Sequence, residues 1–237
     1  MKSLTSHNDE NTLYCFSPPV MLLTFTIEFA LAIYILFTAK LKISSTLIIL
    51  ILISLGIFQL AEYQVCSDKS LSWMRIGFIA ITLLPPLGLN LINLIVKKPW
   101  YNYIGYGLAA VFIGAFLIST LSIQNAVCGG NYVMTTLNDS TLSRYFTYYY
   151  YLMLVVGFFT VLTVMMSYKN KPKGDLAKDY LFWIAFGYAS FMIPTAIVYL
   201  FSESARSGIP SIMCGFAVSL AIILTVKVYP ISRKLGI

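Results

Sequence analysis

Seven long apolar stretches dominate this chain of 237 residues and constrain its fold more than any other feature. Each has about twenty residues or more and almost no charge, which is the length that a helix needs to cross a bilayer core of about 30 Å. The stretches lie at residues 18–38, 45–63, 72–96, 102–122, 144–167, 179–201 and 209–229. The sequence therefore predicts an all-α, polytopic membrane protein, a bundle of seven transmembrane helices.

The composition predicts one membrane domain that covers residues 1–237. Hydrophobic residues make up 59% of the chain and charged residues 11%, against about 25% charged in a soluble domain. The polar parts are short: a tail at 1–17, a loop at 123–143 and a basic loop at 168–178. A net charge of +7 suggests nucleic acid in a soluble protein. Here most basic residues flank apolar stretches, so they indicate topology, and we expect no nucleic-acid partner.

The charged residues divide unequally between the two sides of the predicted bundle. The side with the C-terminus has two acidic residues and eleven basic ones, which are Lys40, Lys42, Lys97, Lys98, Lys169, Lys171, Lys173, Lys178, Lys227, Arg233 and Lys234. The other side has five basic and six acidic residues. Because basic loops stay in the cytoplasm, we expect a plasma-membrane protein with its N-terminus outside and its C-terminus inside.

Three of the four cysteines fall on the predicted outer side, where disulfides persist. Cys66 lies just before the third helix, and Cys128 lies in the 123–143 loop. The sequence predicts a Cys66–Cys128 disulfide that holds this loop over the mouth of the bundle, with Cys15 as an alternative partner for either residue. Cys214, in the last helix, is predicted to be a buried thiol.

Polar residues near the outer end of the second and third helices indicate a possible site. Gln59 and Glu62 are three residues apart and share one helix face. Arg75 lies about one turn into the next helix, so a Glu62–Arg75 pair is expected across the hairpin. Such a pair is either a structural ion pair at the membrane border or part of a patch that binds a ligand headgroup.

Glu28 lies near the middle of the first helix, where an ionised carboxyl is costly. It must face the bundle interior, either protonated or paired with a donor. Pro85-Pro86 falls at a similar depth in the third helix and frees carbonyls of the preceding turn. An acid beside freed backbone groups is typical of an ion or ligand site, although a hydrogen bond that only joins helices is the alternative.

Four consecutive tyrosines, residues 148–151, open the fifth helix. They are typical of an aromatic belt at the membrane interface, but consecutive residues point all round a helix, so some must face inward. We therefore predict an outward-open cavity between the first, second, third, fifth and sixth helices, with Glu28 beside Pro85-Pro86 as its floor. Its predicted ligand-binding residues are Glu28, Gln59, Glu62, Arg75, Tyr148, Tyr151 and Tyr199.

Two short motifs resemble a group of prokaryotic seven-helix membrane proteins. Cys15-Phe-Ser17 precedes the first helix, and Phe58-Gln-x-x-Glu62 lies in the second. That group carries Cys-Phe-Ser at the N-terminus and Phe-Gln-Gln-x-x-Glu in a corresponding span, so the spacing to the glutamate differs here by one residue. The group has no assigned activity, so the resemblance implies the seven-helix architecture only.

The residues exclude several kinds of chemistry. His7 is the only histidine, which excludes multi-histidine zinc sites and a Ser-His-Asp triad. Lys227 lies too near the end of the last helix to be a retinal lysine. We expect no cofactor and no metal, and a catalytic role is less expected than a binding role.

The first hypothesis is a receptor-like or accessory binding protein for a small or lipid ligand. It would lie among membrane lipids and signal through a membrane protein partner. The alternatives are a proton-coupled transporter that uses Glu28 and an intramembrane lipid-modifying enzyme.

Overall fold

The structure, a computed structural model, describes residues 17–39, 42–68, 70–98, 100–118, 123–128, 133–137, 139–167, 175–201 and 208–237. Seven helical spans in these residues are long and apolar enough to cross a membrane, which confirms the predicted fold class. The spans are α1 (Pro18–Thr38), α2 (Ile43–Asp68), α3 (Leu71–Thr82) with α4 (Leu84–Val96), α5 (Trp100–Leu117), α6 (Ser140–Ser167), α7 (Asp175–Phe201) and α8 (Ile209–Ile223), which continues through the π-helical Leu224–Val228 into α9 (Tyr229–Leu235).

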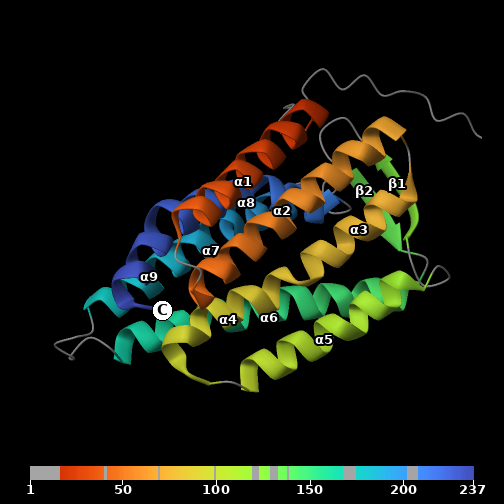
Figure 1. The fold of residues 1–237 in the computed structure, drawn as a ribbon. Helices are drawn as coiled ribbons and strands as arrows, with labels where there is room; N and C mark the ends of the chain where they lie inside the picture. The colour runs from red at the N-terminus through yellow and green to blue at the C-terminus, as the bar shows by residue number, and fades with distance from the viewer. Residues whose placement is uncertain are drawn as a thin grey trace, which may run out of the picture.

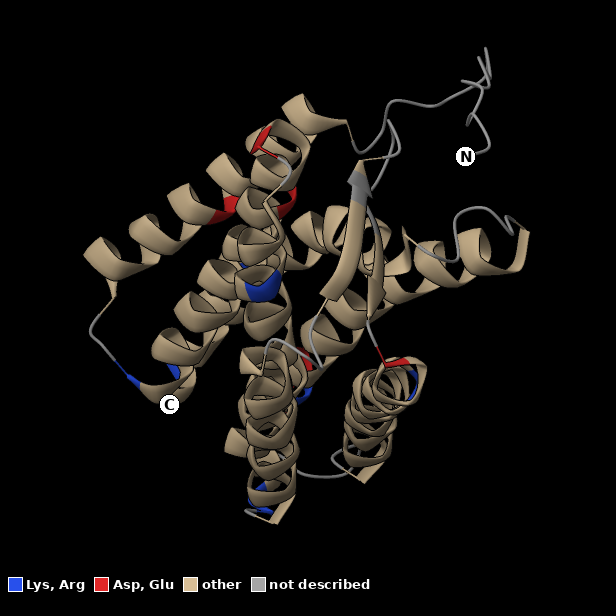
Figure 2. Ribbon diagram, turned by 90° about the vertical axis from the view of Figure 1, so that its right-hand side faces the viewer, with Lys and Arg blue, Asp and Glu red and all other residues tan. Residues whose placement is uncertain are grey.

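The second span, α2, is the central element of the bundle. It packs against α1, α3, α4 and α8, while α5 lies at the edge against α3 and α4 (Figure 1). Apolar side chains are buried along its whole length, as expected for a helix surrounded by other helices. It also buries Gln59 and Glu62. Charged residues are sparse along all the spans (Figure 2).

The third span breaks at its two prolines, as predicted. α3 ends at Thr82, Leu83 forms a turn, and α4 begins with Pro85 and Pro86 in its first turn. Pro86 has no N–H, so it cannot bond the Thr82 carbonyl four residues earlier. The Tyr149 hydroxyl donates to that carbonyl instead, at 2.7 Å. A buried tyrosine of α6 therefore supplies the donor that the Thr82 carbonyl lacks at the break, and it joins α6 to the third span.

A disulfide-linked β-hairpin covers one end of the bundle, called the hairpin end here. Strands β1 (Ile123–Cys128) and β2 (Val133–Leu137) pair antiparallel, and β1 packs against α2 and α3. The Cys66–Cys128 disulfide, with a Cα–Cα distance of 5.3 Å, joins the end of α2 to β1 and confirms the predicted pairing. The Val133 N–H donates to the Ser211 hydroxyl of α8 at 3.3 Å, so both strands are held to the bundle.

Two predicted boundaries shift in the structure. The 123–143 segment contains the hairpin, and α6 already begins at Ser140 because Asp139 caps it, accepting from the Thr141 N–H at 2.7 Å. The basic loop predicted at 168–178 ends earlier, since α7 begins at Asp175. Its residues 168–174, like the tail up to residue 16 with Cys15, lie outside the described residues.

Candidate functional site

A groove opens between α6 and α7 in the halves of these helices that are nearer to the hairpin. Its volume is about 720 Å³, and most of the side chains that line it are apolar. From α6, α7 and α8, the lining residues are Thr147, Tyr148, Tyr151, Leu152, Val155, Met192, Thr195, Ala196, Tyr199, Leu200 and Met213. The three tyrosines predicted from sequence, Tyr148, Tyr151 and Tyr199, thus line the same groove.

A second chamber, of about 210 Å³, lies under the hairpin. Thr135 and Leu137 of β2 form part of its wall, together with side chains of α3, α6 and α8. The residues that it shares with the groove are Thr147, Tyr151, Tyr199 and Met213. The groove and the chamber therefore adjoin, and the hairpin covers the inner one.

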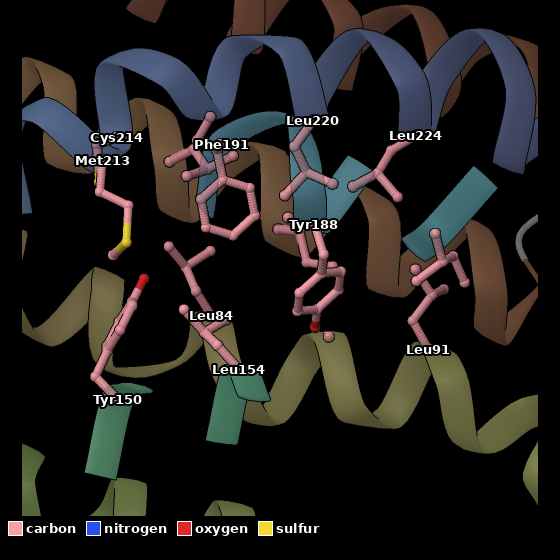
Figure 3. Close-up of a pocket in the computed structure, with 15 residues that line it drawn as sticks. Leu84, Leu91, Tyr150, Leu154, Tyr188, Phe191, Met213, Cys214, Leu220 and Leu224 are labelled. Carbon is pink, nitrogen blue, oxygen red and sulfur yellow. The ribbon is translucent and has the colours of Figure 1, made fainter. Parts of the chain in front are cut away.

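A small apolar cavity of about 40 Å³ continues this series into the centre of the bundle. Tyr150 of α6 and Met213 of α8 border both this cavity and the chamber under the hairpin. Figure 3 shows these two side chains pointing toward one another, and it shows Tyr188 of α7 directed at α4. The three spaces thus adjoin one another in series and share lining residues from the side of the bundle to its middle.

The structure distributes the four consecutive tyrosines differently from the prediction. Tyr149 and Tyr150 are the ones buried in the bundle, whereas Tyr148 is 62% exposed and lines only the groove. Tyr151 lies between these two environments and lines both the groove and the chamber. The expectation that some of the four face inward is correct, but the inward pair is the middle one.

The predicted polar residues of the first two spans gather in a second region, bounded by α1, α2 and α8. The exposed fractions of Glu28, Gln59 and Glu62 are 0%, 2% and 1%. Glu28 lies over Gly56, where its Oε2 would be 3.9 Å from the Cβ of a larger residue. The Ser211 hydroxyl of α8 lies close to the Glu62 carboxyl, and Cys214 is near enough to both carboxyls to interact electrostatically.

Two details of the predicted cavity differ from the structure. No ion pair joins Glu62 to Arg75 in the part of the chain that the structure describes, and Arg75 is half-buried with its Nε lacking a hydrogen-bond partner there. Glu28 packs against α2 and α8, whereas Pro86 contacts α5, where its Cβ lies 3.2 Å from the Cβ position of Gly105.

The predicted site residues therefore fall into two groups. None of the three cavities described above is lined by Glu28, Gln59, Glu62 or Arg75. The tyrosine groove lies between α6 and α7, and the carboxyls lie between α1, α2 and α8, so α8 contributes to both regions. Whether either group binds a ligand stays a prediction.

Sequence reasoning missed several residues of the groove. Thr147 and Thr195 line it, each one helical turn before a tyrosine that was predicted, Tyr151 and Tyr199. That spacing of four residues was a usable signal, because such residues share a helix face. Met213 and Thr135 had no such signal, since only the packing of α8 and the hairpin brings them to the groove and chamber.

The described residues contain no group of three or more His, Cys, Asp or Glu side chains that could hold a metal ion. Searched against models of known protein families, the chain matches none, and no curated protein matches its sequence. The resemblance of Cys15-Phe-Ser17 and Phe58-Gln-x-x-Glu62 to the prokaryotic seven-helix group stays a prediction. The function must therefore be inferred from the two regions themselves.

Proposed function

We propose that this membrane protein is a binding protein, receptor-like or accessory to a partner, that holds a membrane lipid in the groove between α6 and α7. The groove itself is the observation that supports this function. Its volume of about 720 Å³ falls within the range of about 300–1,000 Å³ that is usual for ligand pockets. Its lining is mostly apolar, as an acyl chain requires.

The position of the groove favours a lipid over a water-soluble ligand. Leu152 and Leu200 line the groove and are also exposed on the side of the bundle, a surface that meets acyl chains in a membrane. The α6 part of the lining, from Thr147 to Val155, covers about 12 Å of helix. This length is close to half of a hydrocarbon core of about 30 Å. The groove therefore suits one lipid of a single leaflet, entering sideways from the membrane.

The polar groups of the groove and chamber gather toward the hairpin end. Hydroxyls of Thr135, Thr147, Tyr151 and Tyr199 line the chamber under the hairpin. Hydroxyl groups can donate to or accept from the oxygens and hydroxyls near a lipid headgroup, although the Thr147 hydroxyl donates to the Ser143 carbonyl at 2.8 Å and can only accept. In this proposal the acyl chain lies along α6 and α7, and the polar end of the lipid lies under the hairpin.

The test is to fill the groove and measure the lipid that remains bound. Ala196→Trp places a large ring in the groove, and Val111→Trp places the same ring on α5, where Val111 is 67% exposed and does not line the groove. Each variant would be purified from vesicles of defined phospholipid composition and analysed by native mass spectrometry. We expect Ala196→Trp to lower lipid occupancy at least tenfold and Val111→Trp to leave it unchanged. Equal lipid occupancy in both variants would contradict the proposal.

Proton-coupled transport is the second candidate, because Glu28 and Glu62 are both fully buried within spans. It would be tested by proton-driven substrate flux into liposomes, which Glu28→Gln should abolish. The lipid-modifying enzyme is less well supported. Neither carboxyl lines the groove, so a lipid held there would not meet a carboxyl acid or base.

A further inference from the structure

Hydroxyl groups are the polar groups that the described side chains present to the chamber under the hairpin. These side chains belong to Thr135, Ser143, Thr147, Tyr150, Tyr151 and Tyr199. None of the described residues that line the chamber or the adjoining groove is charged, and the polar side chains of the groove are likewise those of threonine and tyrosine. A ligand that reaches the chamber therefore meets neutral groups, each able to accept a hydrogen bond.

The Tyr150 side chain is a buried polar group without a partner. Only 6% of its surface is exposed, and its hydroxyl makes no hydrogen bond to another described residue. Tyr150 lines both the chamber and the central cavity, and its ring points toward Met213, which lines both as well (Figure 3). Buried hydroxyls are normally paired. This one therefore points to a ligand in the chamber that supplies the missing hydrogen bond.

The neighbouring tyrosine shows the contrast. The Tyr149 hydroxyl donates to the Thr82 carbonyl at 2.7 Å, and Tyr149 lines none of the three cavities. Two adjacent buried tyrosines thus have different roles. One hydroxyl is used for packing inside the protein, and the other remains available to a bound molecule.

The surroundings of Tyr150 disfavour a charged headgroup. Burying an ionised group without a counter-charge costs far more than burying a neutral polar group. Phosphate groups are usually bound by Arg or Lys, or by N–H groups at a helix N-terminus. The described lining of the chamber includes no Arg or Lys. The start of α8 adjoins the chamber, but its second residue, Pro210, has no N–H to offer an anion.

We propose that the lipid in the groove is uncharged and carries a hydroxyl group, as a diacylglycerol or a long-chain alcohol does, and that this hydroxyl pairs with Tyr150 in the chamber. The inference rests on the proposed lipid-binding function and names the class of lipid. Tyr151 lines both the groove and the chamber, so a chain that lies along α6 can end beside Tyr150. A lipid hydroxyl both donates and accepts, so it fits whichever role the Tyr150 hydroxyl takes.

The experiment is a competition between lipids that carry the same oleoyl chain. The purified protein is placed in dioleoylphosphatidylcholine vesicles that contain equal, small amounts of dioleoylglycerol, oleyl alcohol and dioleoylphosphatidate, and the bound lipids are identified by native mass spectrometry. We expect an uncharged lipid to be enriched about tenfold over its share of the membrane, and phosphatidate not to be enriched. Enrichment of dioleoylglycerol or of oleyl alcohol supports the proposal and identifies the source of the hydroxyl.

Tyr150→Phe tests the residue, with Tyr149→Phe as the matched control. Because the Tyr150 hydroxyl has no partner among the described residues, Tyr150→Phe should keep the unfolding midpoint of the lipid-free protein and lose about tenfold in enrichment. Tyr149→Phe should do the reverse, since it loses the hydrogen bond to Thr82 and leaves the chamber intact. If Tyr150→Phe does not fold, the competition in the unsubstituted protein still decides the class of lipid.

Two results would overturn this inference and leave the proposed function standing. One is a preference for phosphatidate or phosphatidylcholine, and the other is unchanged enrichment in folded Tyr150→Phe, each with lipid that Ala196→Trp still displaces. Failure of the proposed function gives a different result, in which Ala196→Trp displaces no lipid of any class. That result would overturn both proposals.

Discussion

Replacing Gly88 by alanine tests the packing at the centre of the bundle. The Tyr188 hydroxyl of α7 occupies the position that a Cβ on Gly88 would take, and the ring carbon Cζ lies 3.2 Å from that position. Both residues are buried, so the ring must move for the methyl group to fit. Overpacking a core costs about 1–3 kcal/mol. Because a cavity of about 40 Å³ adjoins the Tyr188 ring and can accept part of the movement, we expect the lower half of that range.

The cause can be isolated with a second substitution. Tyr188→Phe removes the hydroxyl, but Cζ remains at 3.2 Å, so it should relieve the cost of Gly88→Ala only in part. The expected coupling energy is about 0.5–1 kcal/mol, the size found for residues in direct contact. Unfolding would be followed by tryptophan fluorescence in mild detergent.

The control for this experiment is Gly107→Ala on α5. A Cβ at Gly107 would meet nothing within 4 Å, so alanine there should be neutral or stabilising through its higher helix propensity. Two results would contradict the close approach of α7 to α4. One is that Gly88→Ala has the same stability as the control, and the other is that Tyr188→Phe does not reduce the free energy lost in Gly88→Ala.

Two further substitutions test the break at Pro86 and the hairpin. Tyr149→Phe should lower the free energy of unfolding by about 1 kcal/mol, because the Thr82 carbonyl loses its donor in an apolar environment. Tyr148→Phe, on the exposed face, is the control and should leave the free energy of unfolding unchanged. The same unfolding assay compares the two variants. Replacing both Cys66 and Cys128 by serine should cost at most about 4 kcal/mol for a separation of 62 residues. The cost is an upper limit because two of the spans between these residues stay helical in the unfolded state. No change in the unfolding midpoint after this replacement would contradict the role given to the hairpin.

The spans and the break could be predicted because each depends on local sequence. A stretch such as 18–38 has no stable alternative to a helix in a bilayer, and Pro85-Pro86 removes two backbone donors in any context. The hairpin was missed although its signal was present. In the sequence, Gly129-Gly130 stands between two short runs with β-branched residues, but these runs lie inside a segment that appears as a polar loop.

The site was only partly predictable, because sequence gives the depth of a residue and not its neighbours. The burial of Glu28 followed from the cost of a carboxyl in lipid, and the structure places it fully inside the bundle. Its partners did not follow, since Pro85-Pro86 and α8 are equally possible at that depth. Only the packing of the last span against α1 and α2 separates Glu28 from the tyrosines of the groove.

The orientation of the bundle is the last prediction. The described residues at the C-terminal end of the bundle include Lys97, Lys98, Arg233 and Lys234, so by the positive-inside rule we predict that this end lies in the cytoplasm. The disulfide at the hairpin end favours the same orientation, because disulfides persist in an oxidising compartment.

The Cys128 thiol can report this orientation. It becomes free when Cys66 is replaced by serine, and the Cys128 side chain is exposed, whereas Cys214 is buried and should stay silent. With Cys15 also replaced, a membrane-impermeant maleimide should label Cys128 in intact cells. Labelling that requires permeabilised cells would place the hairpin in the cytoplasm. In that case neither the basic residues nor the disulfide would report the orientation of the bundle, and the lipid groove would belong to the inner leaflet.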